Sequence, residues 1–182
     1  MKSPIFIVGG GHAGVEAALA ISRLKQKCVI VTMDKMALGR MSCNPAIGGL
    51  AKSHLVHEID ALGGIMSVAA DASGLQYKTL NMSKGRAVRS LRIQTDKKKY
   101  PKFIANVISN NENITVLEGE VVSFEVSSSR VSSVSLSDGE NYSCSSLIIT
   151  SGTFLSGLIH IGNKSFRAGR FGEASSVGLT DT

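Results

Sequence analysis

The stretch Ile5-Phe6-Ile7-Val8-Gly9-Gly10-Gly11-His12-Ala13-Gly14 decides the fold of this chain of 182 residues. Its first four residues form an apolar run long enough for a buried parallel strand. After the glycines, residues 12–25 carry apolar side chains at helical spacing, namely Ala13, Ala17, Ala20, Ile21 and Leu24. A strand, a glycine turn and a helix in this order predict an α/β fold with a Rossmann-type parallel sheet that binds a dinucleotide.

The glycines of this fingerprint have separate physical tasks. Gly9 permits the tight turn, Gly11 lets the backbone approach a pyrophosphate, and Gly14 lets the helix pack closely on the strand. The first turn of the helix offers free N–H groups and the positive end of a dipole to the phosphates. The predicted cofactor-binding residues of this segment are Gly9, Gly10, Gly11, His12, Ala13 and Gly14.

The next predicted strand, residues 28–32 (CVIVT), lacks the acidic residue that usually ends it and binds the ribose hydroxyls. The strand ends in Thr32, and the nearest acid is Asp34. Either side chain can serve the ribose. Glu16, on the first helix, is either functional or part of a solvated helix face.

A cysteine follows shortly after this nucleotide-binding unit, in the segment Leu38-Gly39-Arg40-Met41-Ser42-Cys43-Asn44-Pro45-Ala46-Ile47-Gly48-Gly49. The Asn-Pro and Gly-Gly pairs predict a turn or loop around Cys43. A loop-borne thiol beside a nucleotide suggests redox or thiol chemistry, whereas the alternative is a small buried hydrophobic residue.

Several of these segments resemble the MnmG/GidA family, flavoproteins that install the carboxymethylaminomethyl group on the wobble uridine of tRNA. The resemblance rests on GGGHAG, on MSCNPAIGG (residues 41–49) and on four later segments. These are residues 58–64 (EIDALGG), 81–94 (NMSKGRAVRSLRIQ), 152–155 (GTFL) and 159–162 (IHIG). Arg86, where a proline is usual, and Pro101 depart from the family pattern.

The resemblance implies FAD-dependent tRNA wobble-uridine modification, with NADH and methylene-tetrahydrofolate as co-substrates in the parent family. It assigns Cys43 as a catalytic thiol that adds to the uracil ring and makes its C5 more nucleophilic. It also adds three cofactor-binding residues. They are Val121 beside the adenine, Gly152 in a glycine loop, and Ser176 at the flavin.

The chains of this family are several times longer than 182 residues. We therefore expect residues 1–182 to be the N-terminal part of an FAD-binding domain, without the insertion domain and the C-terminal tRNA-binding domain. An MnmE-type GTPase partner and a homodimer belong to the family, but the regions that bind them would be largely missing. Such a fragment is expected to be inactive alone. The alternatives are another FAD- or NAD-dependent oxidoreductase, which usually carries a paired cysteine motif, and a non-catalytic nucleotide-binding remnant.

The positive charge of the chain is concentrated in one segment. Residues 84–102 hold eight of the lysines and arginines and a single acid, a balance of +7 against a net charge of +6 for the whole chain. Such a segment fits nucleic-acid phosphates, although a solvated helix face is the simpler interpretation of Lys97-Lys98-Lys99. The predicted tRNA contacts are Lys84, Arg86, Arg89 and Arg92.

The remaining periodicity predicts helices and short strands. A helix is expected over residues 50–62, with Leu55, Ile59 and Leu62 on one face. A second is expected over residues 94–110, with a kink or a helix start at Pro101. Strands are expected over residues 75–80, 114–117, 121–126, 131–136 and 147–150, and a three-stranded antiparallel meander over about residues 114–146.

Composition places the chain among cytoplasmic globular proteins. Its hydrophobic fraction is 43%, and its three cysteines are an odd number without metal-binding spacing, as expected in a reducing compartment. His54 and His57 lie three residues apart without a third ligand, so no metal site is predicted. No apolar run reaches the roughly 20 residues of a membrane helix, and no signal peptide fits before the first strand.

Overall fold

The computed structural model describes residues 3–41 and 44–182. Its centre is a parallel sheet in the order β10-β1-β2-β6, which confirms the Rossmann-type prediction. The four strands are β1 (Ile5–Val8), β2 (Cys28–Thr32), β6 (Ile114–Glu118) and β10 (Ser146–Ile149).

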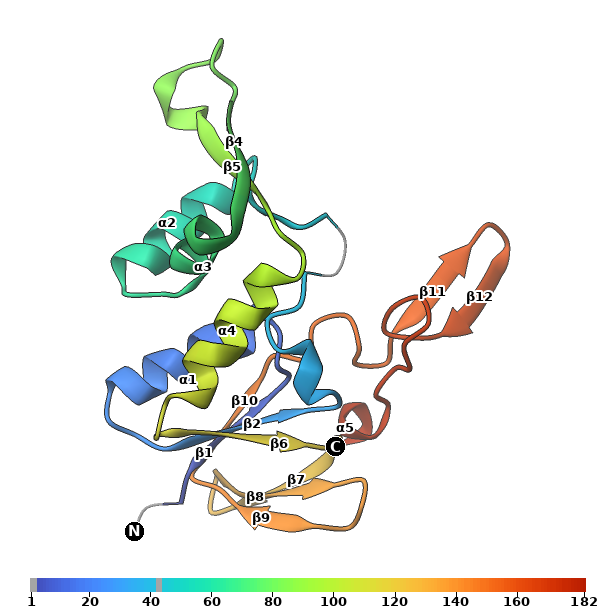
Figure 1. The fold of residues 1–182 in the computed structure, drawn as a ribbon. Helices are drawn as coiled ribbons and strands as arrows, with labels where there is room; N and C mark the ends of the chain where they lie inside the picture. The colour runs from blue at the N-terminus through green and yellow to red at the C-terminus, as the bar shows by residue number, and fades with distance from the viewer. Residues whose placement is uncertain (1–2, 42–43) are drawn as a thin grey trace.

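The alternation of side chains in the parallel sheet creates two hydrophobic cores, one on each face. Ile7 and Ile30 are fully buried against α1 (His12–Arg23) and α4 (Lys99–Ser109). Phe6 points to the opposite face, where an antiparallel meander covers the sheet (Figure 1). The meander consists of β7 (Val121–Ser127), β8 (Arg130–Leu136) and β9 (Asn141–Ser143). The parallel sheet is therefore shielded from water on both sides, as parallel sheets require.

The helix α1 forms where the sequence predicts it, but it buries a different face. Ile21 is buried as expected, whereas Leu24 lies just past the helix and is exposed. The buried set is Gly14, Val15, Ala18, Leu19, Ile21 and Ser22. Because apolar residues occur on every side of this helix, apolar spacing alone cannot identify the face that packs.

A second, smaller sheet forms an arm that extends away from the parallel sheet (Figure 1). Its antiparallel order is β3-β5-β4. Its strands are β3 (Ala46–Gly48), β4 (Gly74–Leu80) and β5 (Ser90–Thr95), with η2 (Arg86–Val88) near the tip. Two helices, α2 (Lys52–Ala61) and α3 (Met66–Ser73), pack beside it. The buried residues of α2 are Ser53 and Val56, while Ile59 is half-buried and Leu55 and Leu62 are exposed, so the face with the predicted apolar residues is not the face that packs.

The helix predicted over residues 94–110 begins later, because Thr95 ends β5. Asp96 accepts hydrogen bonds from the N–H groups of Lys98 and Lys99, at 2.8 and 2.9 Å, and so satisfies donors that the helix start leaves free. Pro101 lies in the first turn of α4, where its missing N–H costs no helical hydrogen bond. The helix-start interpretation of Pro101 is confirmed.

The C-terminal residues return to the sheet after a projecting hairpin. This hairpin pairs β11 (Leu158–Ile161) with β12 (Lys164–Arg167), and the short helix α5 (Gly178–Asp181) then packs against β7. The short helix η1 (Lys35–Ala37) follows β2. None of the helices in the described part of the chain has both the length and the apolar character needed to cross a membrane.

Candidate functional site

The carboxyl ends of the four parallel strands, or the residues directly after them, meet at one cavity of about 330 Å³. Open α/β sheets bind ligands at this edge, and the volume is in the range of roughly 300–1,000 Å³ usual for ligand pockets. The lining comes from the glycine turn, from residues 31–40 and 119–121, and from the C-terminal segments 150–155 and 170–179. Segments far apart in the sequence thus build a single site.

The glycine turn is held in place by its neighbours on both sides. The Gly9 N–H donates to the carbonyl of Val31 at 2.8 Å, and the Thr150 hydroxyl donates to the carbonyl of Val8 at 2.7 Å. Gly9 has a φ of +102°, and a Cβ on Gly14 would lie 1.9 Å from the Gly9 carbonyl oxygen. Both positions therefore require glycine for the turn itself.

Gly11 differs from the other two fingerprint glycines, because a Cβ there would meet no atom within 4 Å. It caps the N-terminus of α1 with extended backbone, without a side-chain cap, and it lines the cavity. The open space beside Gly11 and the unpaired N–H groups of the first helical turn make this the natural position for an anion.

The cavity brings together most of the predicted cofactor-binding residues. Gly9, Gly10, Gly11, Val121, Gly152 and Ser176 all line it. His12, Ala13 and Gly14 are not among its lining residues. Ser176 is held by its backbone, whose N–H donates to the Phe154 carbonyl at 2.9 Å.

His12 is half-buried at the start of α1. Its ring lies 5.6 Å from that of Tyr100 in α4, and its Nε2 has no hydrogen-bond partner among the described residues. Burial, assisted by the charge of Lys52, lowers the pKa of His12 to about 4. His12 is therefore neutral at physiological pH and adds no positive charge to the helix N-terminus.

The position after β2 holds both candidates for the ribose. Thr32 and Asp34 line the cavity, but the Thr32 hydroxyl donates to the Asp34 carbonyl at 3.2 Å and is engaged within the turn. The Asp34 carboxylate accepts from the N–H of Met36 at 2.8 Å and caps η1. As a carboxylate it retains free lone pairs, whereas the hydroxyl of Thr32 has already used its proton.

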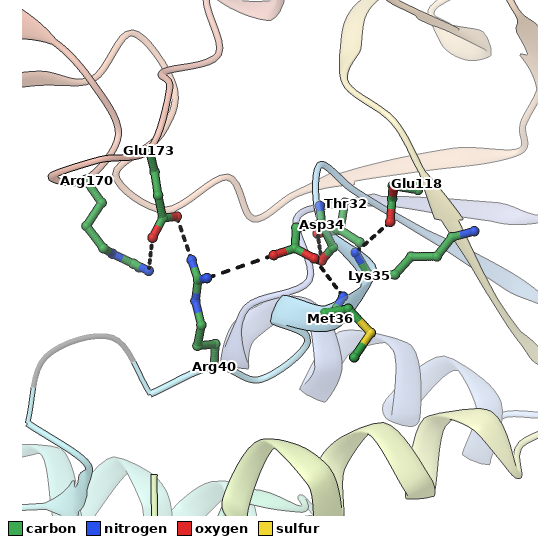
Figure 2. Close-up of polar contacts among 8 residues, drawn as sticks. All are labelled: Thr32, Asp34, Lys35, Met36, Arg40, Glu118, Arg170 and Glu173. Atoms are coloured by element: carbon green, nitrogen blue, oxygen red, sulfur yellow. Dashed lines mark hydrogen bonds and ion pairs between the residues drawn. The ribbon is translucent and has the colours of Figure 1, made fainter. Parts of the chain in front are cut away.

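An ion network across the cavity was not predicted from the sequence (Figure 2). Arg40 pairs with Glu173 at 2.5 Å and faces Asp34 at 3.9 Å, and Arg170 pairs with Glu173 at 3.6 Å. Arg170 also lies over the ring of Phe154, 5.2 Å from its centroid. Of this region only Ser176 was predicted from the sequence, and nothing in the sequence indicates that Arg170 and Glu173 pair with each other or with Arg40.

Glu16 turns out to join the two sheets instead of facing solvent. Its carboxylate accepts hydrogen bonds from the N–H groups of Ile65 and Met66, the latter at 2.8 Å, at the start of α3. Arg23, also on α1, donates to the Gly63 carbonyl at 2.7 Å. A carboxylate at a helix N-terminus is favourable. Because α1 packs on the parallel sheet and α3 packs beside the arm, this contact fixes the arm to the parallel sheet.

The four predicted tRNA contacts lie on the arm, apart from the cavity. Lys84, Arg86 and Arg89 are exposed near its tip, and Arg92 is half-buried on β5. Arg92 is directly opposite Lys78 of β4, an exposed residue that the sequence analysis missed. Only strand register reveals this pair, because register decides which residues of two neighbouring strands lie opposite each other.

The predicted catalytic residue, Cys43, lies outside the described residues. The other two cysteines are buried, and burial raises the pKa of Cys28 to about 11 and raises that of Cys144. Neither is therefore a reactive thiol. Within residues 3–41 and 44–182, no group of three or more histidine, cysteine, aspartate or glutamate side chains is placed to hold a metal ion.

Comparison with known proteins gives consistent matches to one family. The model of the family "Glucose inhibited division protein A" matches residues 4–182. The tRNA uridine 5-carboxymethylaminomethyl modification enzyme MnmG of Sulfurihydrogenibium sp. is 47% identical over 179 residues, which cover 97% of this chain and 29% of that protein. The same enzyme of Aquifex aeolicus is 46% identical, with 97% and 29% covered.

Solved structures agree with this result. The structure of Aquifex aeolicus GidA in its form II crystal superimposes with a TM-score of 0.93 at 46% identity, covering 99% of this chain and 30% of that chain. The GidA-related protein of Thermus thermophilus shares the fold, with a TM-score of 0.63 at 13% identity. The chain thus spans about 30% of the length of the relatives it matches. Since the family model matches almost every residue, the predicted resemblance is confirmed, and this chain belongs to the glucose inhibited division protein A family.

Proposed function

We propose that residues 1–182 form the N-terminal part of an FAD-binding domain and that FAD binds in the cavity at the carboxyl ends of the parallel strands. The observation that carries this proposal is the unobstructed space beside Gly11, at the uncapped N-terminus of α1. A pyrophosphate there would accept hydrogen bonds from backbone N–H groups and gain from the helix dipole. FAD, when bound, supplies hydride chemistry that no protein side chain provides.

The other lining residues fit the remaining parts of this cofactor. Asp34 is the better placed of the two ribose candidates, because its carboxylate retains free lone pairs at the cavity. The backbone of the buried Val121 would receive the adenine on the opposite side, beside the meander. Gly152 and Ser176 would contact the cofactor from the C-terminal segment.

Gly11→Val tests this assignment directly. Its side chain would occupy the proposed pyrophosphate position, and its Cβ would meet no atom within 4 Å, so we expect a folded protein that has lost bound flavin. Gly85→Val is the matched control, since Gly85 is equally unobstructed but lies on the arm. The measurement is flavin absorbance per protein after gel filtration. Flavin retained by the Gly11 variant at the level of the control would refute the assignment.

The activity we propose for the whole protein is synthesis of 5-carboxymethylaminomethyluridine at the wobble position of tRNA. It is supported by relatives of this name at 46–49% identity. NADH and methylene-tetrahydrofolate would be its co-substrates, and a homodimer and an MnmE-type GTPase its assembly. We assign the uracil-activating thiol to Cys43, because burial leaves Cys28 and Cys144 unreactive. Alkylation of the native protein should therefore modify Cys43 well before the other two; equal rates would contradict the assignment.

The arm is the part of the chain that we propose contacts tRNA. Lys78 and Arg92 face each other across β4 and β5, an unfavourable arrangement of like charges that a phosphate between them would relieve. With Lys84, Arg86 and Arg89 nearby, this surface has the charge of a nucleic-acid interface. If four of these groups each neutralise one phosphate, the logarithm of the tRNA association constant falls with the logarithm of salt concentration at a slope of about −3.6.

The charge-neutralising double variant Lys84→Gln/Arg86→Gln should reduce that slope to about −1.8, because two phosphate contacts are lost. Lys27→Gln/Lys164→Gln removes the same charge from exposed positions outside the arm and is the control. Filter binding of tRNA at a series of salt concentrations measures both. Equal slopes for the two double variants would show that the arm does not contact tRNA.

A further inference from the structure

The ion pair between Arg40 and Glu173 connects two segments that are 133 residues apart in the sequence. Arg40 comes from the segment after β2, and Glu173 from the segment that follows the β11-β12 hairpin. Both side chains line the cavity, and both are about one third exposed. Figure 2 shows the Arg40 guanidinium between the carboxylates of Glu173 and Asp34, with Arg170 on the far side of Glu173.

Each end of this bridge is anchored to a different wall of the cavity. Next to Arg40, the Gly39 N–H donates to the Gly10 carbonyl at 2.9 Å, which ties this side to the glycine turn. The Glu173 carbonyl accepts from the Gly169 N–H at 3.2 Å, and the Thr153 hydroxyl donates to the Gly169 carbonyl at 3.0 Å. The bridge therefore joins the glycine turn to the segment 168–176 across the cavity.

The charges around Arg40 indicate that it holds the segment 168–176 and does not act as a phosphate ligand. Among the described residues the network contains two arginines and two carboxylates, and the charges of these four groups sum to zero. A phosphate approaching Arg40 would displace carboxylates that already neutralise it and would face their repulsion. Hydrogen bonds between charged groups are stronger than neutral ones, and partial burial reduces screening by salt.

We propose that Arg40 is a positioning residue that holds the segment 168–176 against the cofactor cavity through Glu173. This inference rests on the proposed function, in which the ligand is FAD. The segment contributes Arg170, Glu173 and Ser176 to the cavity wall. Movement of the segment would open that wall, so the bridge slows the release of FAD without touching the phosphates.

The first test is the rate of FAD dissociation, followed by the recovery of flavin fluorescence after dilution. Arg40→Gln and Glu173→Gln should each raise the rate roughly fivefold, and the double variant should raise it no further, because both changes remove the same interaction. Arg40→Lys retains the charge and should recover part of the loss. Arg167→Gln removes a charge from the exposed strand β12, where no ion pair was found among the described residues, and should leave the rate unchanged.

The second test does not depend on FAD. In the flavin-free protein, trypsin should cleave after Arg170 faster in Arg40→Gln than in the unmodified protein, because the segment is no longer held. Unchanged dissociation or unchanged cleavage would overturn the inference. If the unmodified protein binds no FAD, the proposed function fails, while faster cleavage still supports the bridge and unchanged cleavage overturns it.

Discussion

The parallel sheet and the arm of this protein differ in how closely their residues are packed. In the parallel sheet the backbone itself is packed closely, as the position of Gly14 against the Gly9 carbonyl shows. On β4 of the arm, Leu75 and Tyr77 are 65% and 53% exposed. The cavity is thus shaped largely by main-chain geometry, whereas strand β4 of the arm leaves large side chains exposed.

Two side chains of α1, Glu16 and His12, lie where the parallel sheet meets the arm. Substituting them tests how the two regions are connected. Glu16 reaches the start of α3, and His12 is half-buried beside Tyr100 and near Lys52. Both are polar groups in the joint where α1 meets the helices α2 and α3 beside the arm. Their removal should affect stability less than backbone clashes in the sheet and more than charge changes on the arm.

The largest effect is expected for Gly14→Ala. The added Cβ would lie 1.9 Å from the Gly9 carbonyl oxygen, and no side-chain rotation can relieve a clash with backbone. We expect the free energy of unfolding to fall by about 3 kcal/mol, even though alanine favours the helix by roughly 1 kcal/mol. Urea unfolding measures the change, and Gly85→Ala on the arm is its control. Similar stability of the two variants would contradict the close packing inferred for the sheet.

The second effect is a loss of folding stability in acid that His12 causes. The pKa of His12 is lowered to about 4 in the folded protein, below its ordinary value of 6.5, so the unfolded chain binds the proton more tightly. Stability should therefore fall as pH drops from 6.5 towards 4, by about 2 kcal/mol from this residue. His12→Gln should lose less stability than the unmodified protein over this interval. If the stability curves of His12→Gln and the unmodified protein run parallel between pH 7 and 4.5, the pKa of His12 is not lowered in the folded protein.

The third effect concerns the joint. Glu16→Gln removes the charge and one acceptor oxygen from the N-terminus of α3, which should cost about 1–2 kcal/mol. Amide hydrogen exchange should accelerate at Ile65 and Met66 before it does in β1. Glu58→Gln, on the exposed side of α2, is the control. Uniform acceleration over both sheets would mean that Glu16 stabilises the whole fold and not the joint.

The smallest effect is expected on the arm. Lys84→Gln/Arg86→Gln changes exposed side chains near its tip and should alter the free energy of unfolding by less than about 0.5 kcal/mol. Thermal unfolding of this variant beside the unmodified protein measures it. A larger loss would show that these charges support the fold, and the contrast between sheet and arm would then disappear.

The sequence by itself predicted the elements whose signals are local. The glycine fingerprint indicated β1, α1 and the nucleotide-binding turn, because close backbone approach demands glycine at set positions. Pro101 marked the start of α4, since proline lacks the N–H that a helix interior requires. Family motifs added Val121, Gly152 and Ser176, which the fold brings to one cavity.

Tertiary structure alone decided the pairings between distant segments. Arg40 meets Glu173, Glu16 meets the start of α3, and Lys78 lies opposite Arg92. The buried faces of α1 and α2 also differ from those that the apolar spacing indicates, because apolar residues occur on several sides of each helix. Such contacts depend on how the layers pack and on strand register, which are properties of the whole chain that no local pattern of residues encodes.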